Sequence, residues 1–381
     1  MIRTLYQCVL LCAGLLLTGC SLLAPKYERP DMDIPASWRT VDLGTLPLNV
    51  DWWKRFNDPV LTALVEEALA HNQDLAASLA RVQSAAAKAG VNAANMMPNS
   101  SATASSANQH DSIRTARAQP GMQRDIYANQ ASLNASWELD LFGRYYNTYR
   151  MMTNVMLGTV AGHEALRLAV ARQTAESYFA LLALDMQLNT SRRTLKVREE
   201  AFRIYTSRYK QGDITELDWQ RARAEVEIAR AQVHTSTIAV DAGEAALAVL
   251  LGRGPREIME RAMERGKAIA TLPAPPVLPE GLPSQLLWRR PDIRAAEYSL
   301  MGSNAGIGAA RAAFFPSISL TGMLGTVSAG VGSLFTGPAG TFSYGVSGNL
   351  PLLDFGRNWY NLKDAHAQKE AAIAANRKTV Q

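Results

Sequence analysis

Cys20 is the residue whose type and neighbours point most directly to a chemical reaction. An apolar run from Leu5 to Leu17 follows the single charge of Arg3, as in the hydrophobic part of an export signal, and it is too short to cross a bilayer as a helix. The run ends in Leu17-Thr18-Gly19-Cys20, and small residues before a cysteine suit a lipoprotein signal peptidase. We therefore expect cleavage before Cys20 and lipid attachment to its thiol; an ordinary signal peptide with a chance cysteine is the alternative.

Other residue types that carry chemistry are not arranged for it. Gly306-Ile307-Gly308 lacks the third glycine of a dinucleotide-binding loop. Glu138 and Asp140 alternate with apolar residues, so we expect them to influence water and ions rather than to act as acid and base. The histidines share no metal-ligand spacing and are His71, His110, His163, His234 and His366. We therefore expect no enzyme activity, no cofactor and no metal.

The composition narrows the class of protein further. The formal charge of +5 over 381 residues is modest, and no basic stripe with interleaved aromatic residues suggests nucleic-acid binding. Cys8 and Cys12 lie in the segment expected to be removed, so no internal disulfide is possible in the remainder. No apolar run of about 18 residues follows Cys20, so no transmembrane helix is expected. Ser21 gives no signal for retention in the inner membrane.

Two stretches of the chain match each other. The first runs from Asn72-Gln73-Asp74 to Met97-Pro98 and the second from Arg290-Pro291-Asp292 to Phe315-Pro316, with an offset of 218 at both ends (292 − 74 and 316 − 98). In addition, Phe142-Gly143-Arg144 matches Phe355-Gly356-Arg357 at an offset of 213 (355 − 142). Each half therefore predicts a helix, a strand, a hairpin loop, a second strand and a second helix.

The predicted strands alternate apolar and polar residues. From Ala131 to Leu141 the odd-numbered residues are apolar, and the even-numbered residues are polar. The strand after Pro98 is weaker because it is mostly Ser and Ala. The second half repeats the alternation, with apolar residues at Ile318, Leu320, Leu324, Phe342, Tyr344, Val346 and Leu350. A period of two over about ten residues is typical of a membrane β-strand with one lipid-facing and one wet face; a soluble sheet with one wet face is the alternative.

Four such strands cannot close a membrane barrel, because the smallest barrels have about eight strands. Open strand edges in lipid leave backbone groups unpaired, at a cost of several kcal/mol each. If these strands span a membrane, several chains must therefore share one barrel.

The predicted helices are unusually long. No proline interrupts the helical pattern from Phe142 to Lys210, and at about 1.5 Å per residue this stretch extends roughly 100 Å. Leu181, Leu188, Leu195, Phe202 and Tyr209 recur every seven residues along it. Gln211-Gly212-Asp213 indicates a turn. The returning helix has a seam of small and branched residues, namely Ala222, Val226, Ala229, Val233, Ser236, Val240, Gly243 and Leu247. We expect a coiled-coil hairpin.

At this point the residues resemble a known family. Asp51-Trp52-Trp53, Asp58-Pro59 and the segment from Asn72 to Arg81 are similar to the NodT-type outer-membrane factor lipoproteins of resistance-nodulation-division efflux systems. The segments 289–297 and Phe314-Phe315-Pro316-Ser317-Ile318 carry the same resemblance, which runs from the cysteine box to the last residue.

The resemblance implies a mixed α and β membrane protein that forms a homotrimer. Each protomer would give four strands to a twelve-stranded outer-membrane barrel, continued across the periplasm by long coiled-coil hairpins. The chain would be lipid-anchored in the outer membrane and act as the passive exit duct of a tripartite efflux pump for drugs or other small molecules. Its partners would be a periplasmic adaptor (membrane fusion) protein and an inner-membrane resistance-nodulation-division pump.

The resemblance also places the docking tip. The segment from Arg208 to Leu217 is similar to the first helix-turn-helix tip of the family, and Gly212 suits a turn that favours a positive φ. Arg208, Tyr209, Gly212 and Leu217 are therefore the candidate adaptor contacts; the alternative is that they only cap and pack the hairpin.

These observations divide the chain into five segments. We expect a lipoprotein signal peptide at 1–19, an extended lipid-anchored segment at 20–58, a first efflux repeat at 59–271, a Pro-rich link at 272–283 and a second repeat at 284–381. The second repeat is expected to be incomplete, since only 24 residues follow Arg357 (381 − 357) and the final hairpin is missing. Two alternatives to the duct are a truncated non-conducting product and a lipid-anchored periplasmic coiled-coil protein without a pore.

Overall fold

The computed structural model divides the chain into two units. One unit contains Met1–Asp33, Val82–Val160 and Asp292–Gln381, and the other contains Ile34–Arg81 and Ala161–Pro291. The residues that the structure describes are 23–30, 51–112, 114, 125–260, 262–267, 269–271 and 289–381. The expected signal peptide at 1–19, Cys20 and the expected link at 272–283 lie outside the described residues.

The elements follow one another in an order that occurs twice. A helix, two strands and another helix appear in each half, as α3-β1-β2-α4 and as α8-β3-β4-α9, which is the series that the repeat predicts. The described elements are η1 (Trp52–Phe56), α2 (Pro59–His71), α3 (Gln73–Ala94), β1 (Asn99–His110), β2 (Asp125–Leu139), α4 (Arg144–Gln211), α5 (Glu216–Leu250), α6 (Pro255–Glu260), η2 (Ile269–Thr271), α8 (Pro291–Ala312), β3 (Ser317–Ser328), η3 (Val331–Ser333), η4 (Gly337–Ala339), β4 (Gly340–Asn349) and α9 (Arg357–Val380).

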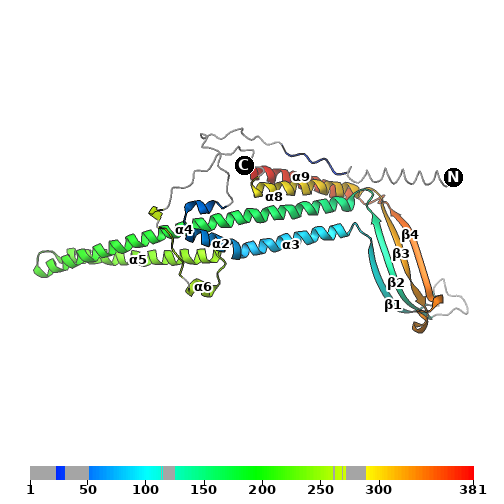
Figure 1. Cartoon of the computed structure of the whole chain (residues 1–381), viewed down its shortest axis with the longest axis horizontal. Coiled ribbons are helices and arrows are strands. Elements are labelled where there is room, and N and C mark those ends of the chain that lie inside the picture. Colours follow the sequence, from blue (N-terminus) through cyan, green and yellow to red (C-terminus); the bar gives the residue numbers. More distant parts are fainter. Residues whose placement is uncertain are drawn as a thin grey trace. The chain divides into compact units, whose positions relative to one another are not determined.

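The strands form one antiparallel sheet in the order β1-β2-β3-β4 (Figure 1). The register places Leu133 opposite Leu324 and Leu324 opposite Phe342. Directly opposed residues of antiparallel strands lie on the same face, so the apolar positions of different strands gather on one face of the sheet. The predicted alternation is confirmed as far as the strands extend, but β2 ends at Leu139 and β4 at Asn349, so Asp140, Leu141 and Leu350 lie beyond them. The weakly predicted first strand is also present, since β1 pairs with β2 along its whole length.

A long helical hairpin dominates the second unit. α4 is one continuous helix of 68 residues, as its proline-free sequence predicts. α5 returns beside the distal part of α4 (Figure 1) and buries most of the predicted seam, namely Val226, Ala229, Ser236, Val240 and Leu247. A Cβ added at Gly243 would lie 3.1 Å from Leu184 and 3.4 Å from Leu181, so the small residue permits the close approach of the two helices.

An apolar core joins α2 to this hairpin. Leu61 and Val65 of α2, Leu181 of α4 and Leu247 of α5 are fully buried in it. Each large side chain buried in this way contributes about 1.5–3 kcal/mol. α2 starts where it does because Asp58 accepts hydrogen bonds from the N–H groups of the first turn and Pro59 occupies the first helical position.

In the unit that contains the sheet, the segment 23–30 lies along α8. Arg29 forms a 2.6 Å ion pair with Glu297, and burial together with Glu297 raises the pKa of Tyr27 to about 12. Further along α8, the side-chain amide of Asn304 donates to the carbonyl of Pro25 over 2.7 Å. Within the described residues, none of the helices combines the length and the apolar composition that crossing a bilayer requires.

Candidate functional site

The two faces of the sheet differ in chemistry. On the polar face, Thr103 and Ser132 share a 2.9 Å hydrogen bond, and the amide of Asn134 donates to the hydroxyl of Thr103 over 3.0 Å. On the opposite face, Leu133 and Phe342 are exposed large apolar side chains. A face whose hydroxyls and amides bond one another and water suits an aqueous path, whereas the exposed apolar face suits hydrocarbon.

The carboxylates at the end of β2 are tied to the start of α4. Glu138 accepts a 2.6 Å hydrogen bond from Arg144 and a 3.1 Å hydrogen bond from the hydroxyl of Tyr145. Burial is the main reason why the pKa of Tyr145 is raised. Asp140 accepts hydrogen bonds from the backbone N–H groups of Tyr145 and Tyr146, so it caps α4. Strand alternation alone did not reveal this capping role.

The tip of the hairpin is built around Gly212. Its φ is +80°, which confirms the positive φ expected from the sequence. The N–H of Asp213 donates to the carbonyl of Arg208 over 2.9 Å, and the N–H of Gly212 to that of Tyr209 over 3.1 Å, so the turn satisfies the last carbonyls of α4. A Cβ at Gly212 would meet nothing within 4 Å, so the backbone conformation, and not space, is what favours glycine.

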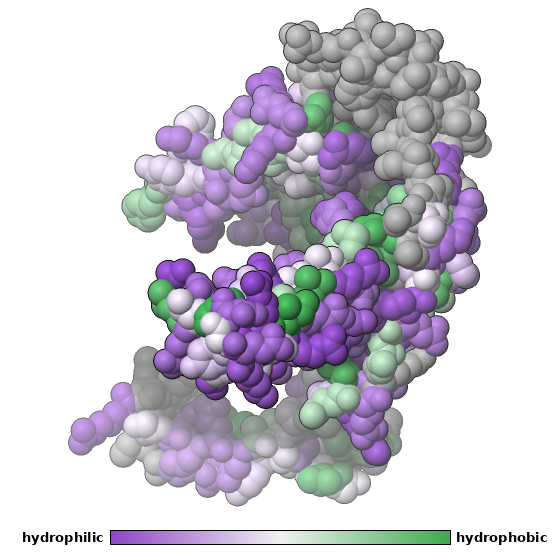
Figure 2. Space-filling view, turned by 90° about the vertical axis from the view of Figure 1, so that its left-hand side faces the viewer, coloured by the Kyte–Doolittle hydropathy of each residue, from purple (hydrophilic) through white to green (hydrophobic). Residues whose placement is uncertain are grey.

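The predicted contact residues lie at this tip in different environments. Arg208 is exposed and Leu217 is 59% exposed. The ring of Tyr209 stacks on Trp219 of α5 with centroids 5.5 Å apart, so it also holds the hairpin together. The end of the hairpin faces the viewer in Figure 2, where hydrophobic residues lie among mostly hydrophilic ones. Trp219 was not among the predicted residues, because stacking across a hairpin has no signature in the sequence.

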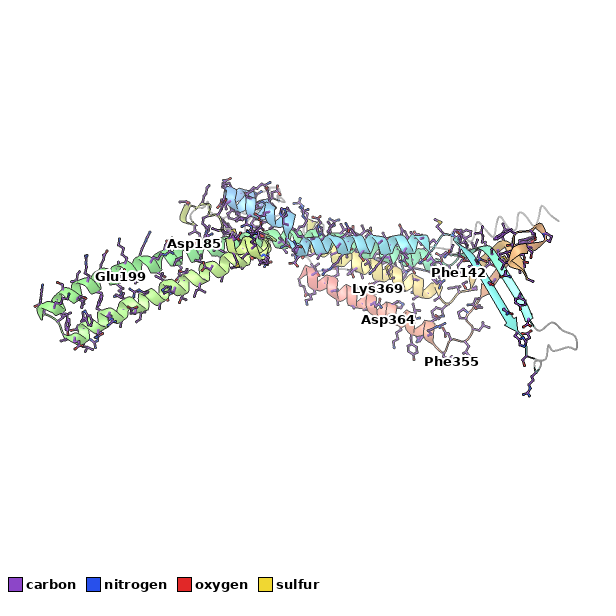
Figure 3. All side chains as sticks on the ribbon, turned by 90° about the horizontal axis from the view of Figure 1, so that it is seen from below. Phe142, Asp185, Glu199, Phe355, Asp364 and Lys369 are labelled. Atoms are coloured by element: carbon purple, nitrogen blue, oxygen red, sulfur yellow. The ribbon has the colours of Figure 1, made fainter. Side chains whose placement is uncertain are left out.

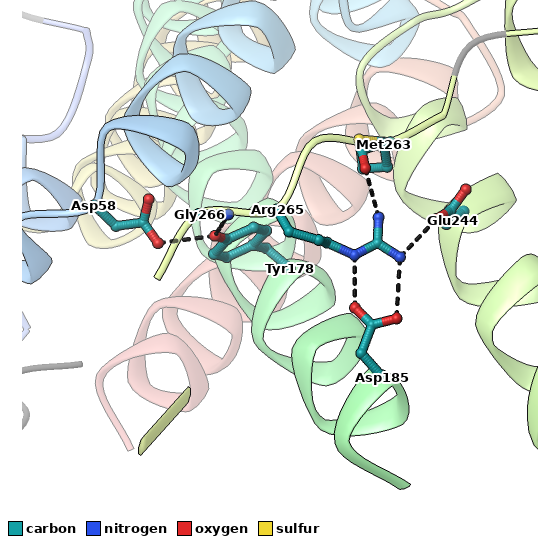
Figure 4. Close-up of polar contacts among 7 residues, drawn as sticks. All are labelled: Asp58, Tyr178, Asp185, Glu244, Met263, Arg265 and Gly266. Atoms are coloured by element: carbon teal, nitrogen blue, oxygen red, sulfur yellow. Dashed lines mark hydrogen bonds and ion pairs between the residues drawn. The ribbon is translucent and has the colours of Figure 1, made fainter. Parts of the chain in front are cut away.

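A segment after α6 fastens the two long helices together. Arg265 donates to Asp185 of α4 over 2.6 and 3.2 Å and to Glu244 of α5 over 2.6 Å (Figure 4). It also donates to the backbone carbonyl of Met263 over 2.7 Å. The hydrogen bond to Asp185 is the main reason why the pKa of Arg265 is raised. We call this arrangement of Arg265, Asp185 and Glu244 the arginine clamp.

A buried polar pair adjoins the arginine clamp (Figure 4). The hydroxyl of Tyr178, whose side chain is fully buried, donates to Asp58 over 2.8 Å and accepts from the N–H of Gly266 over 3.0 Å. Burial, followed by the hydrogen bond to Asp58, raises the pKa of Tyr178 to about 12. The pair therefore connects the start of α2, the middle of α4 and the segment that carries Arg265.

The residues that could carry chemistry do not form a reactive centre in the part of the chain that the structure describes. No group of three or more His, Cys, Asp or Glu side chains there could hold a metal ion. The hydrogen bonds of the polar face and the tip, and the ion pairs of the arginine clamp, hold these elements together.

This architecture matches that of known proteins. The model of the family described as outer membrane efflux protein matches residues 64–253 and 282–381. The chain is 32% identical to the antibiotic efflux pump outer membrane protein ArpC of Pseudomonas putida, over 96% of this chain and 76% of the relative. It is 30% identical to SilC of Salmonella typhimurium, named a probable outer membrane lipoprotein, over 96% and 78%. The solved structure of the CmeC outer membrane channel of Campylobacter jejuni superposes with a TM-score of 0.87 at 26% identity, covering 94% of this chain and 76% of that one.

Proposed function

The chain belongs to the outer membrane efflux protein family and is an outer-membrane channel component of an efflux pump, and we propose that it works as a passive exit duct that several copies build together. The observation that carries this proposal is the sheet, with one polar and one apolar face and with β1 and β4 at its two edges. Pairing these edges between copies would satisfy their backbone groups in lipid, and the polar faces would line a wet lumen.

The family resemblance supports a homotrimer with twelve strands in one barrel. We expect the full chain from outer-membrane fractions to run on gels as an oligomer that heating dissociates. Its mass should correspond to three copies of the chain. A monomer that mild salt releases from the membrane would contradict the duct and favour an interaction protein without a pore. The exported compounds would be drugs or other small molecules, moved by an inner-membrane pump.

We propose that the hairpin tip docks a periplasmic adaptor, which links the chain to a resistance-nodulation-division pump. The exposed Arg208 and Leu217 on either side of Gly212 support this assignment. Gly212→Val places a β-branched residue at a positive φ. We expect it to abolish cross-linking to the adaptor while the oligomer still forms. Loss of the oligomer as well would mean that the turn is only structural.

A matched pair of substitutions tests the same surface without changing the backbone. Leu217 and Ile238 are both exposed apolar residues of α5, 59% and 68% exposed, but only Leu217 lies at the tip. Leu217→Ser should weaken the cross-linking to the adaptor, whereas Ile238→Ser should not. Equal effects of the two substitutions would remove the evidence for a specific docking tip.

We propose that Cys20 carries a lipid near the end of the sheet at which β3 starts. Arg311, in the last turn of α8, donates to the carbonyl of Leu23 over 3.2 Å, and β3 begins at Ser317. Only two residues lie between Cys20 and Leu23, so the three chain steps from Leu23 to Cys20 span at most about 10 Å. A lipid on Cys20 would therefore lie close to the membrane level that the strands define.

Fatty-acid labelling tests the lipid anchor. Cys20→Ser should abolish incorporation of a radioactive fatty acid, whereas Cys12→Ser, in the expected signal peptide, should leave it intact. Labelled Cys20→Ser protein would refute the assignment. Because acyl chains only strengthen anchoring, the variant is still expected to reach the membrane through its strands.

A further inference from the structure

The two halves of the chain meet along one seam inside the unit that contains the sheet. β2 of the first half pairs with β3 of the second half, and Phe142, just before α4, stacks on Phe315, just after α8, with ring centroids 4.7 Å apart. The other sides of the two halves, at β1 and β4, are the edges of the sheet. The internal repeat indicates what can cover these edges.

The repeat offsets convert each residue of one half into its counterpart in the other half. Adding 218 to residues of α3 and β1 gives α8 and β3, and adding 213 to residues of β2 and α4 gives β4 and α9. The conversion reproduces an observed pairing: Ala102 opposite Leu133 becomes Leu320 opposite Val346, which is the register of β3 with β4. The two halves therefore share their strand register as well as their sequence.

Applied to the seam between the halves, the same conversion gives a contact that one chain cannot make with itself. Leu133 opposite Leu324 becomes Val346 opposite Ser106, which joins the two outer edges. We infer that β4 of one copy pairs with β1 of a second copy in this register, with Val346 opposite Ser106. The register is consistent with the faces of the sheet. Ser106 lies four residues along β1 from Ala102, an even number, so it is on the face of Leu133. Val346 lies on the face of Phe342, which is the same apolar face.

The helices beside the sheet supply an independent check. A Cβ at Gly306 of α8 would lie 3.3 Å from the sulfur of Met151 of α4. Their counterparts are Lys88 of α3 and Asp364 of α9, two exposed residues of opposite charge. Figure 3 shows Asp364 on α9. In the described residues Lys88 has no ion pair, and Asp364 only accepts a 2.7 Å hydrogen bond from Gln368. The inferred seam brings these two opposite charges together.

The aromatic contact at the end of the seam has a counterpart too. Phe142 on Phe315 becomes Phe355 on Met97 of the next copy. Phe355 is 89% exposed and Met97 is 65% exposed in the single chain, although both are large and apolar. A thioether against an aromatic ring is a favourable contact, so the second copy would cover both side chains.

A glycine position completes the pattern. A Cβ at Gly308 would lie 2.8 Å from the side chain of Asn147, so α8 and α4 approach closely there. The counterpart Gly90 has nothing within 4 Å of the same position, and the counterpart of Asn147 is Tyr360, which is exposed. The Tyr360 ring would lie over Gly90 of the second copy.

Disulfide cross-linking of the full-length chain in outer membranes tests the register. Opposed Cβ atoms of paired strands are about 4.5–5.5 Å apart and diagonal ones about 7–8 Å apart, and a disulfide favours the shorter separation. Ser106→Cys combined with Val346→Cys should give covalent multiples of the chain on boiled, non-reducing gels after oxidation. The same-face shifted pairs, Ala104→Cys or Asn108→Cys with Val346→Cys, should give much less product, and each single variant should give none.

A charge reversal tests the helical part of the seam. Lys88→Asp or Asp364→Lys alone should lower the temperature at which the oligomer dissociates, and the two together should restore it. Asp364→Lys combined with Lys369→Asp keeps the net charge but leaves two lysines facing each other, so it should not restore the dissociation temperature. If this control fully restored the dissociation temperature, the inferred ion pair between Lys88 and Asp364 would be refuted.

The inferred register rests on the proposed duct shared by several copies. The results of these experiments distinguish a failure of the register from a failure of the duct. An oligomer that cross-links best through a shifted pair, or through none, would overturn the register and leave the duct standing. A wild-type chain that forms no oligomer would remove the duct and the inference together. A cross-linked product that contains a different protein would also overturn the inference.

Discussion

The arginine clamp gives the sharpest prediction for the helical hairpin. Arg265→Ala removes the side chain that links Asp185 of α4 to Glu244 of α5. The carboxylates of Asp185 and Glu244 then lie on neighbouring helices without a cation between them. Two negative charges that are close together repel each other. We expect the two helices to open locally around these residues while the rest of the unit stays folded.

The size of the effect follows from the geometry. Hydrogen bonds to charged groups contribute about 1.5–3 kcal/mol each, but the three side chains are 28–30% exposed, so water screens part of the interaction. We therefore expect Arg265→Ala to lower the free energy of local opening by about 2–4 kcal/mol. Since about 1.4 kcal/mol is a factor of ten, amide exchange should accelerate roughly 30-fold to 1000-fold. Arg265→Lys should give a smaller acceleration, because an ammonium cannot engage Asp185 in the same bidentate way.

Hydrogen exchange of the full chain in detergent micelles is the assay, read at peptides that contain Asp185 and Glu244. Arg230→Ala is the matched control. Arg230 also bridges the two helices, to Glu199 of α4 and Glu227 of α5, but all three of its side chains are largely exposed. Asp185 and Glu199 lie at separate levels of α4 (Figure 3). Exchange in the Arg230→Ala variant should therefore stay near wild type.

Equal protection in the Arg265→Ala variant and in wild type would refute the reasoning, because it would show that apolar packing alone holds the helices at this level. Acceleration of the same size in the Arg230→Ala variant would refute it too, since burial of the arginine clamp would then make no difference.

Two further predictions concern the buried pair beside the arginine clamp. Gly266→Ala should destabilise the helical unit by about 2–4 kcal/mol in chemical unfolding, because a Cβ there would overlap the carboxylate of Asp58 and lie 2.7 Å from the hydroxyl of Tyr178; unchanged stability would show that the segment shifts freely. Tyr178 has a pKa of about 12 when folded and about 10 when unfolded, so its contribution is complete below about pH 10 and is lost as the pH rises towards 12, on the order of 2 kcal/mol in all. Tyr178→Phe should remove that part of the alkaline loss of stability, and an identical pH profile in both proteins would contradict the assignment.

Local patterns in the amino-acid sequence predict the elements and the two faces of the strands. A period of two from Ala131 to Leu141 can be satisfied only by a strand with two different faces, and a proline-free helical pattern up to Lys210 predicts one long helix. Gly212 in a turn signal predicted a positive φ because few other residues adopt it at low cost. The equal offsets between the halves predicted the order in which the elements recur. The faces of the strands, the long helix and the turn depend on neighbours along the chain, and the repeat compares two copies of such local patterns.

Contacts between residues far apart in the chain become visible only in the folded protein. Arg265 lies 80 positions from Asp185, and Tyr178 lies 120 positions from Asp58. No local pattern marks such pairs, because a charged or polar residue on a predicted helix is ordinarily a solvated one. Asp140 likewise has the sequence position of a strand residue on the polar face, and only the bend into α4 brings the N–H groups of Tyr145 and Tyr146 onto its carboxylate. Periodicity fixes the direction in which a side chain points within its own element, whereas its partner depends on how elements far apart in the chain pack together.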